Sequence, residues 1–375
     1  MDLGLSQEQK MLAEEARKFL SKEWNATRVR EVSCSETGHD KGLWDKMAAL
    51  GWLGIIIPEA YGGLGMGLTE LALLYEECGR ALIPTSFYST ITAALAILQG
   101  GDESRKQDYL PRIVEGSLRM SLAISEPQAI HDPAFFQTAA VFVRGDYTLR
   151  GTKLFVPDAL SADELIVAAR ISPTRKLAGV TLFLIEKDAP GLQFTPLQTF
   201  GGEKQYEIRL DSVRVNPKRI LGTPDEGWAI VQTTLDQATA LQCAEMVGGA
   251  QRVMEMTVQY MNDRYQFDRP IGSFQAVQHA CADMSIEVDA SRELTYQAIS
   301  LIDEGLPARK EISMAKAWAG ETYKHVTLTA HHLFGGIGFS REHDLYLYSS
   351  RAKAAELSLG PGHHHLEVVA DHLGI

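Results

Sequence analysis

Cysteine is scarce in this chain: there are four in 375 residues, and no two of them form a Cys-x-x-Cys pair. A zinc site or a disulfide framework needs several cysteines at short, regular spacing. Their scarcity predicts no metal centre and indicates free thiols in a reducing compartment. The four residues are Cys34, Cys78, Cys243 and Cys281.

Long hydrophobic runs are also missing. No window reaches the roughly 18 uninterrupted apolar residues of a membrane-spanning helix, and Met1–Gln9 has an early acid and no apolar core, unlike a signal peptide. The 36 Lys and Arg are outnumbered by 48 Asp and Glu, which gives a formal net charge of −12. This balance argues against nucleic acid or an anionic membrane as a partner. The sequence therefore predicts a cytoplasmic protein.

Hydrophobic periodicity divides the sequence into three segments. We expect an α+β protein with an N-terminal all-α domain (1–117), a middle antiparallel β-barrel or sandwich domain (118–224) and a C-terminal four-helix bundle (225–375). Ser6 and Gln9 occupy the capping-box positions of a first helix. The expected strands are 120–125, 139–143, 147–155, 165–169, 180–186 and 206–215, and the expected long helices are 227–264, 274–304, 308–334 and 345–359.

Two motifs in the last segment indicate a ligand. Arg264–Gln275 combines an arginine with flanking aromatic residues, and His331–Phe339 contains a Gly-Gly-x-Gly turn. A guanidinium binds pyrophosphate through paired hydrogen bonds, and glycines let backbone amides approach a phosphate. Each motif alone is more simply a helix end. Together, in this order, they favour a dinucleotide-sized cofactor.

Three other clusters have simpler interpretations. The glycines of Tyr61–Leu68 lack the Lys-Ser/Thr of a P-loop, so a structural turn is favoured over a phosphate site. His363–His365 has no acidic or cysteine partner at zinc-site spacing, so a helix start is favoured over a metal. Gly248-Gly249 inside a helix costs about 1 kcal/mol per glycine relative to alanine. That pair predicts a close approach of another helix or a ligand.

The order of segments and the motifs resemble the acyl-CoA dehydrogenase family of flavoproteins over essentially the whole chain. Ile57–Gly65 is similar to the family's Pro-Glu-x-Tyr-Gly-Gly-x-Gly turn, and Ala123–Pro127 is similar to its Thr-Glu-Pro strand end. Gly151–Lys153 matches its Gly-x-Lys hairpin. Arg264–Gln275 resembles its Arg-x-Gln-Phe-Gly-x-Pro-Ile-x-x-Phe-Gln segment, and His332–Gly338 resembles its Gln-x-x-Gly-Gly-x-Gly turn.

The resemblance implies FAD as cofactor, an acyl-CoA as substrate, an electron-transfer flavoprotein as electron acceptor, and a homo- or hetero-tetramer. It places at the flavin ring Leu122, Ile124, Ser125, Phe155 and Pro157. It places at the pyrophosphate and adenosine of a flavin in a neighbouring subunit Arg264, Phe267, Phe274, His332, Gly335 and Gly336. It assigns His131 and Asp236 to substrate binding.

The chain departs from the family where the reaction needs a carboxylate. Removing the α-proton of a thioester requires a base aligned with the flavin, and the family places a glutamate at one of two positions. Those positions are Leu359 and Ala238 here, and neither side chain takes a proton. Glu245, about two helical turns beyond Ala238, is a candidate displaced base. Pairing of Glu245 with an arginine or a backbone group is the favoured interpretation.

Other departures also concentrate at the substrate and the flavin ring. Pro157 replaces a hydroxyl-bearing residue, Thr239 replaces an arginine, and Asp268 replaces a glycine. The combination resembles the base-lacking subunit of heteromeric family members that act on steroid-like or alicyclic acyl-CoA esters. Two alternatives stay open. One is a self-sufficient homo-oligomeric flavoenzyme with a displaced base or an elimination reaction, and the other is a non-catalytic scaffold subunit.

Overall fold

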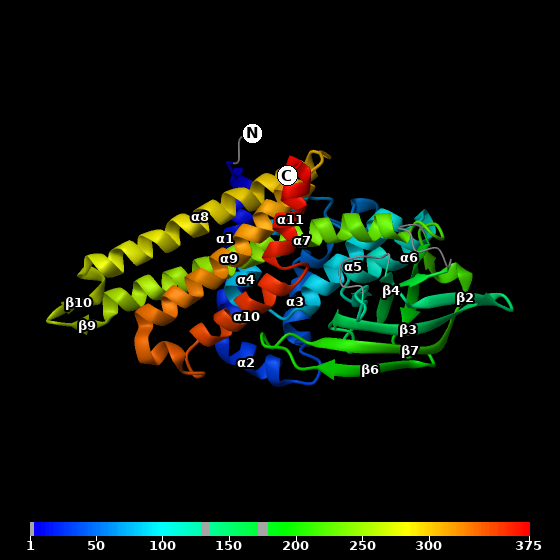
Figure 1. Ribbon diagram of the computed structural model, residues 1–375, viewed down its shortest axis with the longest axis horizontal. Coiled ribbons are helices and arrows are strands. Elements are labelled where there is room, and N and C mark those ends of the chain that lie inside the picture. Colours follow the sequence, from blue (N-terminus) through cyan, green and yellow to red (C-terminus); the bar gives the residue numbers. More distant parts are fainter. Residues whose placement is uncertain (1–3, 129–134, 172–178) are drawn as a thin grey trace. The chain divides into compact units, whose positions relative to one another are not determined.

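The structure, a computed structural model, describes residues 4–128, 135–171 and 179–375. The chain forms two compact units, and each draws on separate parts of the sequence. The helical unit comprises residues 1–29, 67–83 and 236–375, and the sheet unit comprises residues 30–66 and 84–235. Along the chain, helices precede the strands and long helices follow them, as predicted (Figure 1).

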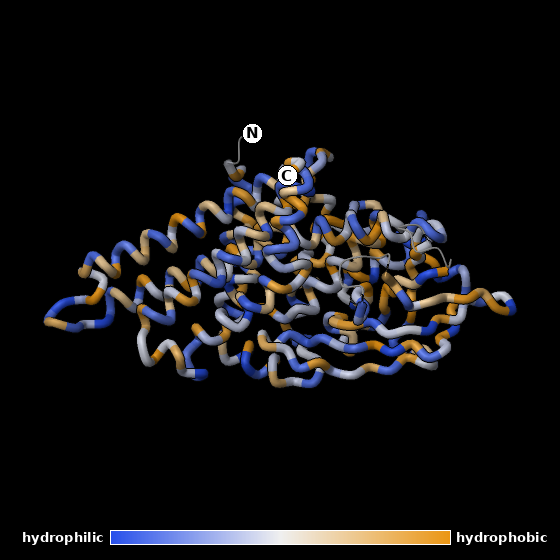
Figure 2. The backbone as a smooth tube through the Cα atoms, viewed as in Figure 1, coloured by the Kyte–Doolittle hydropathy of each residue, from blue (hydrophilic) through white to orange (hydrophobic). Residues whose placement is uncertain are grey.

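Long helices build the helical unit, in which α9 packs against α8, α10 and α11 (Figure 1). Hydrophilic and hydrophobic residues alternate along α8, as burial of one side of a helix requires (Figure 2). Ser6 caps α1 as predicted: its Oγ accepts from the Gln9 amide at 3.2 Å, and Gln9 Oε1 accepts from the Ser6 amide at 2.9 Å. The helices are α1 (Gln7–Glu23), α4 (Leu68–Ala81), α7 (Gly227–Asp263, which belongs to this unit from Asp236), α8 (Gln275–Asp303), α9 (Arg309–Phe334), α10 (Leu345–Leu357) and α11 (Gly362–Leu373).

Glycines allow α4 and α7 to approach closely. A Cβ on Gly248 would lie 1.8 Å from the carbonyl oxygen of Glu76, and a Cβ on Gly79 would lie 2.0 Å from that of Glu245. A side chain cannot fit at such distances, so glycine is required at both positions. The close approach predicted from Gly248-Gly249 is therefore confirmed.

The sheet unit contains, among the described residues, an eight-stranded sheet with the order β6-β7-β3-β2-β4-β5-β8 and with β1 beside β4. Most neighbours are antiparallel, as predicted, but β4 pairs in parallel with β1, where Met120 lies opposite Glu164, and with β2. Strand β6, which contains Pro196, was not expected from the sequence. The strands are β1 (Met120–Ala123), β2 (Ala139–Val143), β3 (Asp146–Pro157), β4 (Glu164–Arg170), β5 (Val180–Glu186), β6 (Leu192–Leu197), β7 (Gln205–Val215) and β8 (Ile220–Leu221). The helices outside the helical unit are α2 (Ala26–Cys34, which straddles the boundary), α3 (Lys41–Ala49), α5 (Ser86–Gly100) and α6 (Glu103–Val114).

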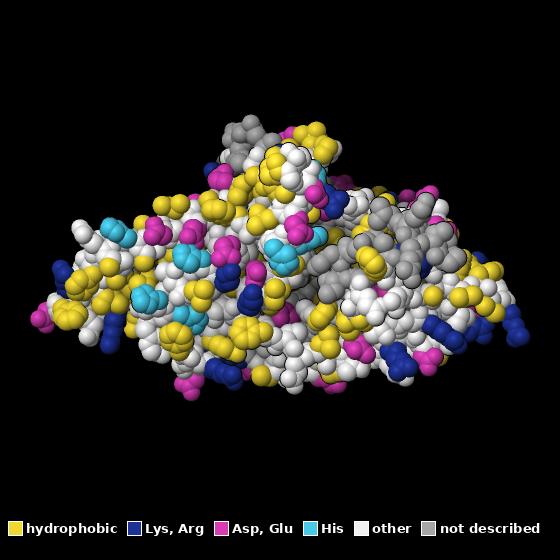
Figure 3. Space-filling view, in the orientation of Figure 1, with side chains coloured by type: hydrophobic (Ala, Val, Ile, Leu, Met, Phe, Trp, Pro, Cys, Tyr) yellow, Lys and Arg dark blue, Asp and Glu magenta, His cyan; other side chains and the backbone are white. Residues whose placement is uncertain are grey.

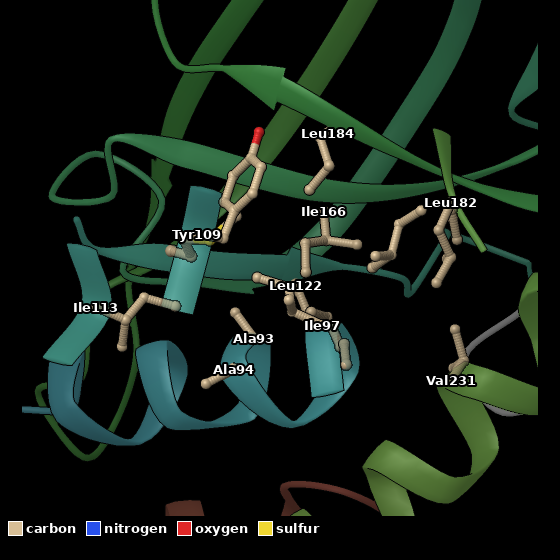
Figure 4. Close-up of a cluster of buried hydrophobic side chains, with 14 of the residues drawn as sticks. Ala93, Ala94, Ile97, Tyr109, Ile113, Leu122, Ile166, Leu182, Leu184 and Val231 are labelled. Carbon is tan, nitrogen blue, oxygen red and sulfur yellow. The ribbon is translucent and has the colours of Figure 1, made fainter. Parts of the chain in front are cut away.

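The part of the sheet formed by β4 and β5 is buried on both faces. All seven residues of β4 are buried. Successive residues of a strand point to opposite faces, and Ile166 and Leu165 accordingly belong to two different hydrophobic clusters. Figure 4 shows Ala93 and Ile97 of α5 on the Leu122 and Ile166 side of the sheet. This packing fixes β1, and therefore the residues that follow it.

The glycine cluster after Ile57 forms a closed turn. The amides of Leu64, Gly65 and Met66 donate to carbonyl oxygens of residues 54–57 at 2.8 to 2.9 Å. A Cβ on Gly63 would lie 2.0 Å from the Ile57 oxygen. Because these amides are used within the turn, the structural interpretation is confirmed over a phosphate site.

Candidate functional site

The end of β1 is joined to β3 by backbone and side-chain hydrogen bonds. Ile124 and Ser125 follow the strand and are half-buried, whereas Leu122 within it is buried. The Leu154 amide donates to the Ser125 oxygen at 2.9 Å. The Lys153 ammonium donates to the Ile124 oxygen at 3.0 Å. The structure therefore brings three of the predicted ring-binding residues together beside β3.

A buried ion pair holds this strand end in place. Lys153 Nζ lies 2.7 Å from Glu126 Oε1, and neither side chain is appreciably exposed, at 0% and 3%. Glu126 Oε2 also accepts from the Gln137 amide at 2.6 Å, and the Lys153 ammonium lies 4.5 Å from the centre of the Phe136 ring. Burial lowers the pKa of Lys153 to about 8, against the opposing effect of Glu126. Glu126 is therefore held by partners that lie 11 and 27 residues away along the chain.

Phe155 lies on an irregular part of β3. The register of β3 with β7 shifts between Lys153 and Val156, and Phe155 has a left-handed φ of 53° with 51% of its surface exposed. Pro157 is half-buried, and its carbonyl oxygen accepts from Ser121 Oγ at 2.5 Å. A bulge that turns an aromatic side chain outward is a common device beside a binding site. Phe155 is thus presented to solvent next to the β1 end, while position 157 offers no hydroxyl.

The Arg264–Gln275 segment contains a tight hairpin of β9 (Tyr265–Gln266) and β10 (Arg269–Pro270), followed by the short helix η5 (Ile271–Ser273). The Ile271 amide donates to the Arg264 oxygen at 2.9 Å and closes the hairpin. Its two turn residues, Phe267 and Asp268, have left-handed φ values of 55° and 62°. Phe267 is 85% exposed. The hairpin therefore projects an aromatic side chain and the exposed Arg264 side chain into solvent.

Asp268 occupies a position that suits glycine better. We expect Asp268→Gly to raise the free energy of unfolding by about 1 kcal/mol, because glycine takes a left-handed φ without a Cβ clash. Thermal unfolding measures the gain. Asp268→Asn is the matched control, since it removes the charge and keeps the Cβ. A gain of equal size in both variants would show that charge, and not backbone conformation, is responsible.

Arg269 is a further residue of this hairpin that the sequence analysis did not single out. Its guanidinium carbon lies 4.0 Å from the centre of the Phe274 ring. The edge of that ring meets Phe267, with ring centres 6.1 Å apart. A signal was present in the sequence, because an arginine and an aromatic residue flank the Pro-Ile-Gly-Ser stretch. Its significance depends on the hairpin geometry.

The second predicted motif lies at the end of α9. The Gly335 amide donates back to the His331 and His332 oxygens, and Gly335 has a left-handed φ of 66°. A Cβ added at Gly335 or Gly336 would meet no atom within 4 Å. The turn continues as η6 (Gly335–Phe339), and His332 is exposed beside it. The glycine turn is therefore open to a ligand on its outer side.

The predicted substrate and base positions lie in different surroundings. Burial raises the pKa of Asp236, and Arg309 opposes that shift. Ala238 is buried on α7. Glu245 is also buried, and its Oε1 lies 2.7 Å from Nε and 2.6 Å from Nη2 of Arg351. The favoured pairing of Glu245 with an arginine is confirmed. His131 lies outside the described residues.

A carboxylate engaged in this way is a poor general base. We expect Glu245→Gln to lower the free energy of unfolding by about 3 kcal/mol, because the largely buried Arg351 guanidinium loses this carboxylate, and to leave turnover of an acyl-CoA, the substrate that the resemblance implies, unchanged. Chemical unfolding and steady-state kinetics on the same preparation provide the test. A hundredfold loss of kcat with unchanged stability would instead identify Glu245 as the displaced base.

The turn that carries Leu359 is held at several points. Lys316, buried on α9, donates to the oxygens of Ala355, Glu356 and Gly360 at 3.0, 3.0 and 3.1 Å. His365 Nε2 lies 3.0 Å from the Leu359 oxygen. Leu359 and Gly360 both have left-handed φ values, of 55° and 102°. The backbone at this family base position is thus tightly fixed although its side chain is apolar.

The described residues contain no group of three or more potential metal ligands. The triple histidine begins α11, as predicted, and His365 is buried with Nδ1 3.2 Å from Ser313 Oγ. No helix in the described part of the chain is both long and apolar enough to cross a bilayer.

Comparison with known domain families identifies three along the chain. The N-terminal domain of acyl-CoA dehydrogenases matches residues 6–117, the middle domain matches residues 121–213, and the C-terminal domain matches residues 225–374.

Known relatives match over most of their length. Acryloyl-CoA reductase (NADH) of Anaerotignum propionicum is 31% identical, with 99% of this chain and 95% of the relative covered. Cyclohex-1-ene-1-carbonyl-CoA dehydrogenase of Geobacter metallireducens is 32% identical, with 95% of each covered. The CarC subunit of the caffeyl-CoA reductase-Etf complex of Acetobacterium woodii is 30% identical, with 90% of each covered.

Solved structures with the same fold include a variant of the Tcur3481-Tcur3483 steroid ACAD. It is 34% identical and has a TM-score of 0.87, with 100% of this chain and 99% of that chain covered. PigA with FAD and proline is 28% identical and has a TM-score of 0.92, with the same shares covered.

Proposed function

The chain belongs to the acyl-CoA dehydrogenase family, and on that premise we propose that it takes part in FAD-dependent α,β-dehydrogenation of an acyl-CoA thioester as the base-lacking subunit of a heterotetramer. One observation carries the proposal. Both family base positions hold side chains that take no proton, Ala238 and Leu359, and the candidate substitute, Glu245, is buried in an ion pair with Arg351.

The residues of the hairpin and of the glycine turn fit the adenosine diphosphate half of FAD. Arg264 and Arg269 are exposed, and neither forms an ion pair within the described ranges. Gly335 and Gly336 leave open space where a Cβ would stand, so a phosphate or ribose can approach the backbone. In the proposed assembly these groups hold the cofactor of a neighbouring subunit. Phe267, at the hairpin tip, and His332 complete this set.

The residues beside the end of β1 fit the flavin-ring half of FAD only in part. Ile124 and Ser125 are held against β3, and Phe155 is turned outward beside them. Pro157 cannot donate a hydrogen bond from its side chain or its backbone nitrogen. FAD, when bound, supplies the hydride acceptor of the reaction. This chain's contribution at the ring is therefore position and packing, with fewer hydrogen bonds than the family pattern provides.

Proton abstraction is the step that this chain cannot perform at the family positions. A general base must reach the proton that it removes, and methyl and isobutyl side chains have no basic atom. We propose that the partner subunit supplies the glutamate. Asp236 and His131 remain proposed contacts of the acyl-CoA, with His131 outside the described residues.

The surface of the helical unit supports assembly with other subunits. Met314, Trp318 and Leu328 lie on one face of α9 by helical spacing and are exposed in the single chain. Figure 3 shows exposed hydrophobic side chains among histidines and acids on the visible face of this unit. The heteromeric and steroid-related part of the proposal is supported by similarity to the Tcur3481-Tcur3483 steroid ACAD. Similarity to the Etf-complex subunit CarC supports an electron-transfer flavoprotein as the acceptor.

Co-expression with a glutamate-bearing member of the family tests the proposal. We expect acyl-CoA turnover only in the complex, and we expect Glu→Gln at the partner's base to abolish it. The matched control is this chain expressed without the partner, with Leu359 and Ala238 as in the natural sequence. Full turnover by the lone chain would support the self-sufficient alternative, and turnover unaffected by the partner's Glu→Gln change would contradict a partner-supplied base.

A further inference from the structure

The β9–β10 hairpin presents two guanidinium groups to solvent. Arg264 enters the hairpin, and Arg269 leaves it, with Arg269 opposite Gln266 in the register. Neither is ion-paired in the part of the chain that the structure describes. The whole chain carries a formal net charge of −12, so carboxylates are abundant. Two arginines left without carboxylate partners on one short hairpin therefore form a local anion-binding feature.

Phe274 holds the second of these arginines in place. The Arg269 guanidinium carbon lies 4.0 Å from the ring centre, which is within the range of a cation–π contact worth about 0.5–1 kcal/mol at an exposed site. Phe267 meets the ring edge at a centre distance of 6.1 Å. Stacking of a guanidinium on a ring leaves its in-plane N–H groups free to bind an anion. One face of Phe274 is thus occupied and cannot stack on a ligand.

We propose that Arg269 is a second phosphate-binding residue of the hairpin and that Phe274 is its positioning residue. The inference rests on the proposed function, in which this hairpin binds the adenosine diphosphate end of a cofactor in a neighbouring subunit. A pyrophosphate has an anionic oxygen on each of its two phosphoryl groups, and Arg264 alone offers one cation. A planar guanidinium already fixed by a ring loses less freedom when it binds than a mobile side chain would.

The same adenosine diphosphate group occurs in FAD and in CoA, so the experiment separates the two. FAD retention reports binding of the cofactor, and the KM for the acyl-CoA reports binding of the substrate. Both are measured on the complex of this chain with its glutamate-bearing partner, at low and high salt. Butyryl-CoA and cyclohex-1-ene-1-carbonyl-CoA serve as the acyl-CoA probes.

The variants are Arg269→Gln, Phe274→Leu and Phe274→Tyr. We expect Arg269→Gln to weaken FAD retention roughly tenfold at low salt, with a smaller loss at high salt because screening already weakens this contact. We expect Phe274→Leu to weaken FAD retention by about threefold. Phe274→Tyr keeps the ring and should retain FAD as well as the parent chain does. A purely structural role of Phe274 would not make the loss salt-dependent. A rise in KM with unchanged FAD retention would place the phosphate in CoA.

Two controls keep the outcomes separate. Arg209→Gln removes an exposed arginine of β7 and changes the net charge equally, so it should alter neither readout. Arg264→Gln tests the proposed function of the hairpin itself. The inference is overturned if Arg264→Gln weakens FAD retention while Arg269→Gln stays within about twofold of the parent in both readouts. If neither substitution has an effect, the proposed function of the hairpin fails as well.

Discussion

Replacing Lys153 by Met is expected to lower the free energy of unfolding by about 3–5 kcal/mol, because the substitution leaves a buried carboxylate without its counter-charge. Lys153 is fully buried and bonds both Glu126 and the Ile124 oxygen. Both bonds end at or beside the strand end that carries the proposed flavin-ring contacts. The same variant should therefore lower the flavin content of the assembled complex. Urea unfolding and absorbance at the flavin band measure the two effects.

The double variant Lys153→Met/Glu126→Gln distinguishes a lost ion pair from lost packing. Removing the carboxylate as well should recover at least half of the lost stability, since replacing both members of a buried pair costs much less than removing one. The exposed Lys218→Met is the matched control and should change the free energy of unfolding by less than about 0.5 kcal/mol. No recovery in the double variant would show that the unpaired Glu126 carboxylate is not the cause of the lost stability.

Lys316→Met is expected to lower the free energy of unfolding by about 2–4 kcal/mol and to loosen the turn at Leu359. The substitution removes the donor of three carbonyl oxygens, those of Ala355, Glu356 and Gly360. Each buried acceptor left without a donor costs about 1 kcal/mol or more. Backbone hydrogen exchange of residues 355–362 measures the loosening, and chemical unfolding measures the stability.

The pH dependence of this effect has a definite sign. Burial lowers the pKa of Lys316 from its ordinary value of 10.5 to about 8. Between these values the unfolded chain binds more protons than the folded one, so this residue makes stability rise with pH in that window. The Lys316→Met variant should lose that rise. Ser313→Ala, which removes only the hydroxyl near His365, is the milder control. A pH profile identical in parent and variant would contradict the account.

Much of the fold was predictable from periodicity and caps. Ser6 caps α1 as expected, and the Gly248-Gly249 pair marks a close helix contact. The parallel pairing of β1 with β4 was not predictable, because a four-residue strand that is buried throughout has no alternation and gives no sign of its partner or direction. Strand β6 was missed because Pro196 and its weakly apolar sequence argue against a strand.

The candidate site likewise contains residues that the sequence alone could locate and contacts that it could not. Motifs located Arg264, Phe267 and the glycine turn, since local sequence specifies tight turns. The contacts of Lys153 and Lys316 were not predictable, because each joins residues 27 to 44 positions apart that only the tertiary fold brings together. Arg269 lies between these cases. Its residue type is visible in the motif, whereas its contact with Phe274 requires the hairpin conformation. The roles assigned to all these residues at the cofactor remain proposals.

The molar ratio of FAD to polypeptide in the purified protein tests the central claim most directly. The chain expressed alone should contain far less than one FAD per polypeptide and should not bleach with an acyl-CoA. The complex with a glutamate-bearing partner should be yellow and should bleach. A lone homomer that is fully loaded with FAD and loses its colour on addition of an acyl-CoA would contradict the claim that this subunit depends on a partner for both cofactor and base.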